Sequence, residues 1–295
     1  MTVDLFRSFI GDPYLFGEIA ANHALNDIFA TGGTPRHALA IAIVPPGPAA
    51  KTEETLFQLL AGARACLDRE CVALVGGHSA EGAEVALGFS ISGMVTPDRI
   101  LRKAGLQPGD VLVLSKPIGT GILFAALMRG RAAAASIAQA IAGMRQSARA
   151  AAQIFAVHGA TAMTDISGFG LAGHLGEMLK ASRATAELDL AAIPLYPGAR
   201  DLAAGGIVST LLPENLVSGG ILRGDLRQAT RALLFDPQTA GGLLAGIPQG
   251  RAAECIAALT AAGYTDAAVI GSVREVGERE PDIVTKNDLC MADSL

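Results

Sequence analysis

Asp27 and Asp165 are the residues of this sequence best suited to metal chemistry, because each is a lone acid beside glycines and apolar neighbours. Asp27 follows His23 by four residues in the run FGEIAANHALNDIFAT, so both side chains project from one face of the expected helix. It also lies about one turn before Gly32, where the helix dipole is negative, so we expect a cationic group nearby. The spacing leaves two interpretations open: an Asp-His pair on a solvated helix face, or a ligand of a metal ion.

Asp165 lies in the run AMTDISGFGLAGHLGEML, ahead of a helix expected to become regular at about Leu171. Gly168 and Gly170 separate Asp165 from that helix, so Ser167 is the better candidate for its N-cap. Asp165 is then available for another role. Mg²⁺ suits it, because this ion takes one or two carboxylates and fills its other positions with water and phosphate oxygens.

The run LVGGHSAEGAE, residues 74–84, is a candidate for phosphate contact. A strand is expected to end in its two glycines, where backbone N–H groups can approach a phosphate. Gly77, His78 and Ser79 are the residues in question, and the side chains of the last two can add hydrogen bonds. A plain turn after a strand is the alternative, and it is the commoner use of such a pair.

Two other glycine runs are expected to be structural. SKPIGTG (115–121) contains Lys116 but does not match the pattern GxxxxGK[ST], so we exclude a P-loop. FDPQTAGG (235–242) is expected to form a proline-containing turn before the strand LLAGI rather than to act in catalysis.

The hydrophobic pattern predicts the elements that position these residues. In the first part we expect helices over 16–31 and 53–69, and strands over 37–44, 71–77 (a buried one) and 87–95. The polar turn RKAGLQPGD then indicates a boundary between domains at 1–104 and 105–295. After it we expect, in order, the strand VLVLS, a helix, a long alanine-rich helix within 129–155, an irregular stretch over 196–224, the strand LLAGI, a helix near 250–262 and the strand AAVIGSV. This mixture predicts two α+β domains.

Composition excludes several classes of protein. With 295 residues, a formal net charge of -5 and scattered basic residues, the chain does not suggest a nucleic-acid surface. Its start, MTVDLFRSFIGDPYLF, does not resemble a signal peptide, and we expect no membrane segment. The four cysteines have no zinc-site spacing and are expected to be reduced thiols of a cytoplasmic protein.

Six stretches taken together resemble one family. They are TVDLF, DPYLFGEIAANHALNDIFATGGTP, LVGGHSAEGAE, LSKPIGTGI, AMTDISGFGLAGHLGEM and DPQTAGGLL, and they run in the family's order from residue 2 to about residue 247. On these the chain resembles selenide, water dikinase (selenophosphate synthetase), within the ATP-binding group that includes aminoimidazole ribonucleotide synthetase.

The resemblance implies a two-domain α/β (α+β) fold, with an N-terminal ATP-binding domain that dimerises through its sheet and a C-terminal α/β domain. It implies a phosphotransferase that converts ATP, selenide and water to selenophosphate, phosphate and AMP. Carried over by position, Asp4 and Gly77-His78-Ser79 would contact ATP, Asp27 would serve both ATP and Mg²⁺, and Asp165 would bind Mg²⁺.

The sequence departs from the family pattern in ways that bear on activity. The family's Gly-rich segment with Cys or selenocysteine and Lys, and its Asp-Asp-Ala-Ala strand, are not found, so no catalytic residue is assigned and weak or no activity is expected of the chain as given. His23 stands where Asn is usual, and Ala240 where Ser is common. Two alternatives follow: a non-catalytic ATP-binding or dimerisation module associated with a redox partner, or another ATP-dependent enzyme of the same superfamily.

Overall fold

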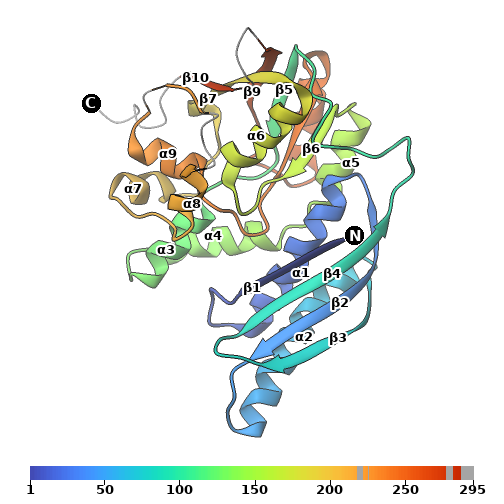
Figure 1. The fold of residues 1–295 in the computed structure, drawn as a ribbon, viewed down its shortest axis with the longest axis vertical. Helices are drawn as coiled ribbons and strands as arrows, with labels where there is room; N and C mark the ends of the chain where they lie inside the picture. Colours follow the sequence, from blue (N-terminus) through green and yellow to red (C-terminus); the bar gives the residue numbers. More distant parts are fainter. Residues whose placement is uncertain (218–221, 225, 277–281, 287–295) are drawn as a thin grey trace. The chain divides into compact units, whose positions relative to one another are not determined.

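The computed structural model describes residues 1–217, 222–224, 226–276 and 282–286 (Figure 1). The chain forms two compact units. The first comprises residues 1–100 together with the short segment 144–147, and the second comprises residues 101–143 and those from 148 onward. Both units mix strands with helices, as expected from the sequence.

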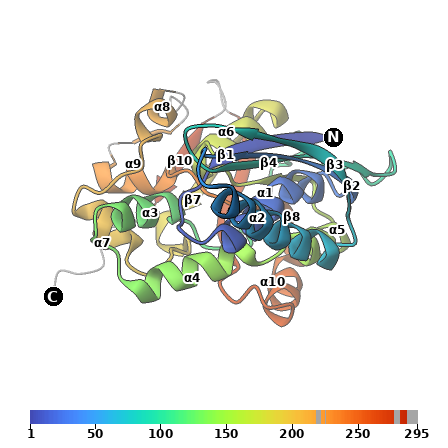
Figure 2. The same cartoon turned by 90° about the horizontal axis from the view of Figure 1, so that it is seen from below.

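The first unit is a four-stranded sheet with two helices on one face (Figure 2). Its elements are β1 (Thr2–Arg7), α1 (Pro13–Ala30), β2 (Thr34–Val44), α2 (Ala49–Arg69), β3 (Ala73–Glu81) and β4 (Ala86–Met94). The strand order is β1-β4-β2-β3, and only the β2–β3 pair is parallel.

Helix α1 confirms the first expected helix and begins three residues earlier. The Asp12 side chain caps it by accepting from the Leu15 N–H at 3.1 Å, and Pro13 occupies the first turn, where its missing N–H costs nothing. Thr31 and Gly32 end it, each with a backbone N–H bonded to a carbonyl of the last turn. Its central apolar residues are buried almost completely, so α1 is the core of this unit.

Strand β3 differs from the buried strand expected over 71–77. It runs straight through Gly76 and Gly77, so there is no turn at the glycine pair, and most of its residues are exposed because β3 is an edge strand. Gly77 has φ +155°, and a Cβ there would overlap the Ala40 carbonyl oxygen on β2. Gly77 is therefore needed for the parallel pairing of β2 and β3. The turn expected from the Gly-Gly pair is wrong.

The second unit contains a six-stranded mixed sheet in the order β10-β7-β9-β5-β8-β6. Its strands are β5 (Asp110–Leu114), β6 (Ala162–Asp165), β7 (Ala184–Asp189), β8 (Leu243–Pro248), β9 (Ala268–Glu275) and β10 (Ile283–Lys286). Its helices are α3 (Thr120–Met128), α4 (Ala134–Arg145), α5 (Arg149–Val157), α6 (Gly170–Ser182), α7 (Ala199–Ala204), α8 (Leu212–Val217), α9 (Gln228–Leu234) and α10 (Ala252–Ala261), with 3₁₀ turns η1 (Leu190–Ala192) and η2 (Gln249–Arg251).

The long alanine-rich helix expected within 129–155 is instead two helices, α4 and α5. Asn22 of α1 explains the break, because its side-chain amide donates to the carbonyls of Met144 at 2.7 Å and Gln146 at 2.9 Å. Those carbonyls lie in the segment 144–147, which belongs to the first unit. The stretch expected to be irregular also contains the short helices α7 and α8.

No helix among the described residues combines the length and the apolar character that crossing a membrane requires.

Candidate functional site

Asp27 and Asp4 lie together at the β1 edge of the first unit. Thr2 of β1 donates its hydroxyl to the Asp27 carboxylate on α1. Asp4 shares the helix-facing side of β1 with Thr2 and Phe6, because alternate residues of a strand point to the same side. The hydrogen-bond donor beside Asp27 is a neutral hydroxyl, and the cationic group expected there stays a prediction.

His23 packs beside this carboxylate pair against an aromatic group. Its ring meets that of Phe6 edge to face, with centroids 5.1 Å apart, and Phe6 in turn contacts Phe9 and Phe16. The solvated Asp-His face that the spacing allowed is therefore wrong for His23, which is half-buried. The aromatic contact holds the imidazole at the edge of the site.

Gly77, His78 and Ser79 lie at the opposite edge of the same sheet. Asp4 pairs with Phe89, Phe89 with Ala40, and Ala40 with Gly77, so Asp4 and Gly77 occupy one row of the sheet. Three strand spacings separate them, about 14 Å. Within one copy of the chain, the structure therefore does not bring these two sets of expected ATP contacts together.

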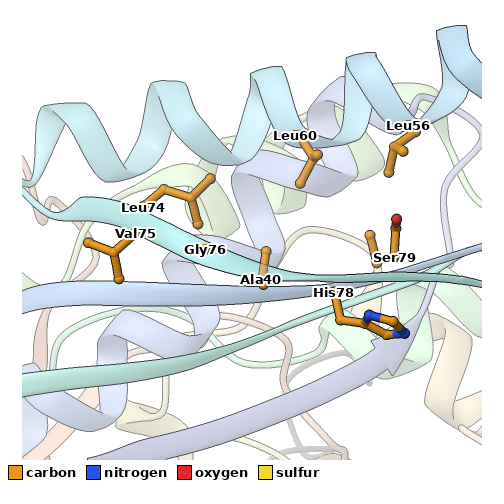
Figure 3. Close-up of a pocket in the computed structure, with 10 residues that line it drawn as sticks. Ala40, Leu56, Leu60, Leu74, Val75, Gly76, His78 and Ser79 are labelled. Atoms are coloured by element: carbon orange, nitrogen blue, oxygen red, sulfur yellow. The ribbon is translucent and has the colours of Figure 1, made fainter.

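His78 and Ser79 also point to opposite faces of β3. Figure 3 shows Ser79 and Leu74 directed toward Leu56 and Leu60 of α2, and His78 directed away from that helix. The groove between α2 and β3 has a volume of about 450 Å³, and its lining is apolar apart from His78 and Ser79. The two side chains cannot hold one phosphate from one side of β3, and the expected turn is wrong because the strand continues here. The contact of Gly77-His78-Ser79 to ATP stays a prediction.

Asp165 is the last residue of β6 in the second unit and is 7% exposed. Three loops meet at this end of the sheet, because Leu114 at the end of β5 pairs with Leu244, and Asp165 pairs with Leu243 at the start of β8. The loops are residues 115–119, 166–169 and 235–242. They contain the three glycine runs of the sequence that belong to this unit.

Backbone hydrogen bonds join the loop after Asp165 to the run FDPQTAGG. The Ile166 N–H donates to the Gly242 carbonyl at 2.8 Å, and the Gln238 N–H donates to the Ser167 carbonyl at 2.9 Å. Asn215 adds a bridge, since its amide donates to the carbonyls of Gly168 and Phe235. The expectation that FDPQTAGG is a structural turn before a strand agrees with this arrangement.

Lys116 and Asp236 are buried in the same loops. Lys116 is 1% exposed, and its ammonium donates to the carbonyls of Gly143 at 3.0 Å and Ala240 at 3.2 Å. Burial lowers the pKa of Lys116 to about 7 and raises the pKa of Asp236 to about 7. An amine held in this way faces backbone carbonyls, which agrees with the exclusion of a P-loop.

Ser167 is not the N-cap of α6, which corrects the expectation from the sequence. The helix begins at Gly170 after Phe169, without a side-chain cap, and the Ser167 hydroxyl instead contacts Nε2 of His174 at 3.2 Å. His174 Nδ1 lies 3.5 Å from a Glu177 carboxylate oxygen. This contact, with the Lys103 ammonium at 2.7 Å, lowers the pKa of Glu177 to about 2.

The candidate metal ligands fit a magnesium ion in their donor chemistry. Asp27 and Asp165 offer hard carboxylate oxygens, and the described part of the chain gathers no group of three or more His, Cys, Asp or Glu side chains. Mg²⁺ takes one or two carboxylates and keeps water and phosphate at its other positions, so each residue is suited to be one of its ligands.

Sequence reasoning missed Gln238 and Thr120. Gln238 is 3% exposed, and its side-chain oxygen accepts from the Gly119 N–H, the Thr120 N–H and the Thr120 hydroxyl at 2.9 to 3.1 Å. The sequence signal was the polar Gln-Thr pair inside an otherwise glycine-rich turn. Its partners lie more than a hundred positions away in the chain, so no local pattern identifies them.

Family models match both parts of the chain. The N-terminal domain model of the AIR synthase related proteins matches residues 1–96, and the C-terminal domain model matches residues 107–283. Together they account for most of the described residues.

Curated relatives extend this match. A selenide, water dikinase of Pelobacter propionicus is 41% identical over 93% of this chain and 79% of its own length. One from Myxococcus xanthus is 39% identical over 96% of this chain and 80% of its own length.

Solved structures share the fold at low identity. A hydrogenase maturation protein HypE in complex with ATP superposes with a TM-score of 0.75 at 20% identity, covering 96% of this chain and 80% of that one. A thiamine-monophosphate kinase from Stenotrophomonas maltophilia gives 0.72 at 19% identity, covering 98% and 85%. The two-domain fold expected from the sequence is therefore confirmed.

Proposed function

The chain belongs to the selenide, water dikinase family within the AIR synthase related proteins, and on that premise we propose that it converts ATP, selenide and water to selenophosphate, phosphate and AMP. The observation that carries the proposal is 41% identity sustained over 93% of the chain to a protein of that activity. The proposed substrates are ATP and selenide, and the proposed metal ion is Mg²⁺. The free thiols of Cys66, Cys71 and Cys255 suit a cytoplasmic location.

The first unit supports the nucleotide side of the proposal. Asp4 and Asp27 share the β1 edge, where Thr2 orients the Asp27 carboxylate. We assign to Asp4 a contact to ATP, and to Asp27 contacts to ATP and the metal ion. The half-buried ring of His23 packs against Phe6 and borders this edge.

The second unit supports the metal side of the proposal. Asp165 lies at the end of a short buried strand. The loop that follows it is hydrogen-bonded to the run 235–242, which restricts the positions that the Asp165 carboxylate can take. Mg²⁺ would supply positive charge that neutralises the charge developing on the phosphates during phosphoryl transfer. The part of Asp165 is to hold that ion in place.

A homodimer formed through the first unit's sheet is part of the proposal. The face of that sheet away from α1 and α2 carries Val3, Leu5, Leu39 and Val75, which are 46–65% exposed. Such an apolar face normally finds cover. A second copy would also explain how Gly77-His78-Ser79, at the edge far from Asp4, takes part in an ATP site: it would serve the site of its partner.

The activity is tested by an anaerobic assay of AMP formation with selenide and Mg-ATP, followed by phosphorus NMR for the selenium-phosphorus product. The expected result is weak AMP formation, because the family's segment with Cys and Lys is not found in this sequence. That activity should depend on selenide and be lost in Asp165→Asn. ATP binding without any selenide-dependent AMP would favour the non-catalytic ATP-binding module. Turnover with an acceptor other than selenide would favour another enzyme of the superfamily.

Assembly is tested by light scattering and by mixed dimers. The chain should be a dimer at micromolar concentration, and Leu39→Glu should make it a monomer. Asp27→Asn and a His78→Ala, Ser79→Ala double variant should each be inactive alone, while their mixture should regain about a quarter of wild-type activity if random exchange leaves half of the dimers with one intact site. Mixtures that stay inactive would show that both sets of residues act from one copy.

A further inference from the structure

Gln238 joins the start of α3 to the turn over 236–242 through both ends of its side chain. Its Oε1 accepts from the first two backbone N–H groups at the start of α3, from Gly119 and Thr120. Its Nε2 donates to the carbonyl oxygen of Asp236 at 2.7 Å and to the carboxylate of Asp236 at 3.0 Å. A neutral amide is the side chain that satisfies donors on one side and acceptors on the other.

The backbone of Gln238 reaches the third loop. Its N–H donates to the Ser167 carbonyl, two residues after Asp165, and the Gly242 carbonyl accepts from the Ile166 N–H, one residue after Asp165. The shape of the turn over 236–242 therefore determines where these two groups lie. That shape depends on the bonds that the Gln238 side chain makes to Asp236 and to α3.

We propose that Gln238 is a positioning residue for the metal ligand Asp165, acting through the turn over 236–242, and this inference rests on the proposed function. Gln238 touches neither metal nor substrate in this role. Its side chain fixes the turn, and the turn fixes the residues that follow Asp165. Loss of the side chain should leave β6 intact and allow the carboxylate at its end to move.

Three variants separate positioning from general stability. Gln238→Ala removes the side-chain hydrogen bonds to α3 and to Asp236. Thr120→Val removes only the hydroxyl that donates to Gln238 and accepts from the Thr239 N–H, so it is a milder lesion if Gln238→Ala does not fold. Thr161→Val is the matched control, because Thr161 immediately precedes β6, at the end opposite Asp165, and donates its hydroxyl to the Asp110 carboxylate at 2.6 Å.

The first measurement is Mn²⁺ binding by electron paramagnetic resonance, in the presence of the β,γ-methylene analogue of ATP. We expect the Kd for Mn²⁺ to rise about tenfold in Gln238→Ala, the range seen when partners of metal ligands are lost, and about threefold in Thr120→Val. Thr161→Val should change it less than about twofold. Gln238→Ala and Thr120→Val that bind Mn²⁺ as the control does would overturn the proposal.

The second measurement needs no metal ion. Hydrogen exchange of the Ile166 N–H, which donates to the Gly242 carbonyl, should be about tenfold faster in Gln238→Ala than in wild type. Exchange of the N–H of Met163, which lies in β6 and donates to the Arg102 carbonyl, should be unchanged. Equal changes at both amides, or none, would show that Gln238 does not fix this loop.

Asp165→Asn distinguishes failure of the inference from failure of the proposed function. If Asp165→Asn loses Mn²⁺ binding and Gln238→Ala does not, only the inference is wrong. If Asp165→Asn binds Mn²⁺ as tightly as wild type, Asp165 is not a metal ligand and both are wrong.

Discussion

Asp27 and Asp165, the two carboxylates expected to hold a metal ion, are positioned by the chain in different ways. Asp27 sits in the last turn of an 18-residue helix, and its partner is one hydroxyl from the adjacent strand. Asp165 ends a four-residue strand, and the loop that follows it is tied to segments more than seventy positions along the chain. The first position is set by local structure and the second by long-range contacts.

The difference indicates where each carboxylate is vulnerable. The hydrogen-bond partner of Asp27 shown by the structure is on the adjacent strand β1, so we expect few substitutions outside α1 and β1 to displace its carboxylate. Asp165 depends on buried polar groups that must all be satisfied, and such networks lose more than one contact when one member is removed.

The largest expected effect concerns the buried Asp236 in the loops of the second unit. Its pKa is raised by burial to about 7 from an ordinary 3.8, so the folded chain holds a proton that the unfolded chain releases. The stability from this group is complete below about pH 4, falls as the pH rises, and is lost above about pH 7. The difference between these two pKa values corresponds to about 4 kcal/mol of stability at most.

Urea denaturation from pH 4 to 8 measures this effect. Asp236→Asn should remove most of the fall, because an amide carries no charge to bury. The free energies of unfolding of Asp236→Asn and of the wild type should differ least near pH 4. A parallel pH dependence in the two proteins would show that the loops of the second unit are not held by a protonated Asp236.

The next effect compares the two carboxylates directly. Asp27→Asn and Asp165→Asn should each weaken Mg²⁺-dependent nucleotide binding by about 100-fold, or about 2.7 kcal/mol, since each removes a proposed charged ligand of a metal ion. Calorimetric titration of the ATP analogue with and without Mg²⁺ measures it. Unchanged affinity in either variant would remove that residue from the metal site.

A glycine pair beside Asp165 tests the role of the loop. Gly170 has φ +70°, and a Cβ there would lie 2.7 to 2.9 Å from backbone atoms of Phe235 and Asp236. Gly170→Ala should therefore lower the free energy of unfolding by about 2 kcal/mol. Gly168→Ala is the control, because a Cβ at Gly168 meets nothing within 4 Å, and it should be close to neutral. Equal losses in thermal denaturation would contradict the clamped loop.

The smallest effect is expected at Asp27. Thr2→Val keeps the shape and the strand propensity of residue 2 and removes the hydroxyl that Asp27 accepts. The cost should be about 1 kcal/mol in stability and less than about tenfold in Mg²⁺ affinity. A loss as large as that of Asp27→Asn would show that one hydroxyl, and not the helix, places the carboxylate.

Local signals in the sequence predicted the elements that carry Asp27 and much of the fold. Helix α1 was evident from its apolar spacing and its glycine stop, and β2, α2 and β4 from similar patterns. β3 was interpreted wrongly because two glycines look like a turn, whereas the reason for Gly77 is the approach of Ala40 from another strand. The break between α4 and α5 was missed for the same reason, since Asn22 causes it from a distant helix.

The segment 144–147 delays the folding of the first unit while the chain is being synthesised. Glu18 of α1 is buried and contacts both Arg69 and Arg145, so the first unit lacks one of these partners until Arg145 has emerged from the ribosome. At typical rates of translation the residues from 101 to 147 take roughly 2 to 10 s. During that interval the nascent chain carries a buried carboxylate with only one of its two arginines. A fragment ending at residue 100 would stay in that state permanently and should be the better substrate for a chaperone or a protease.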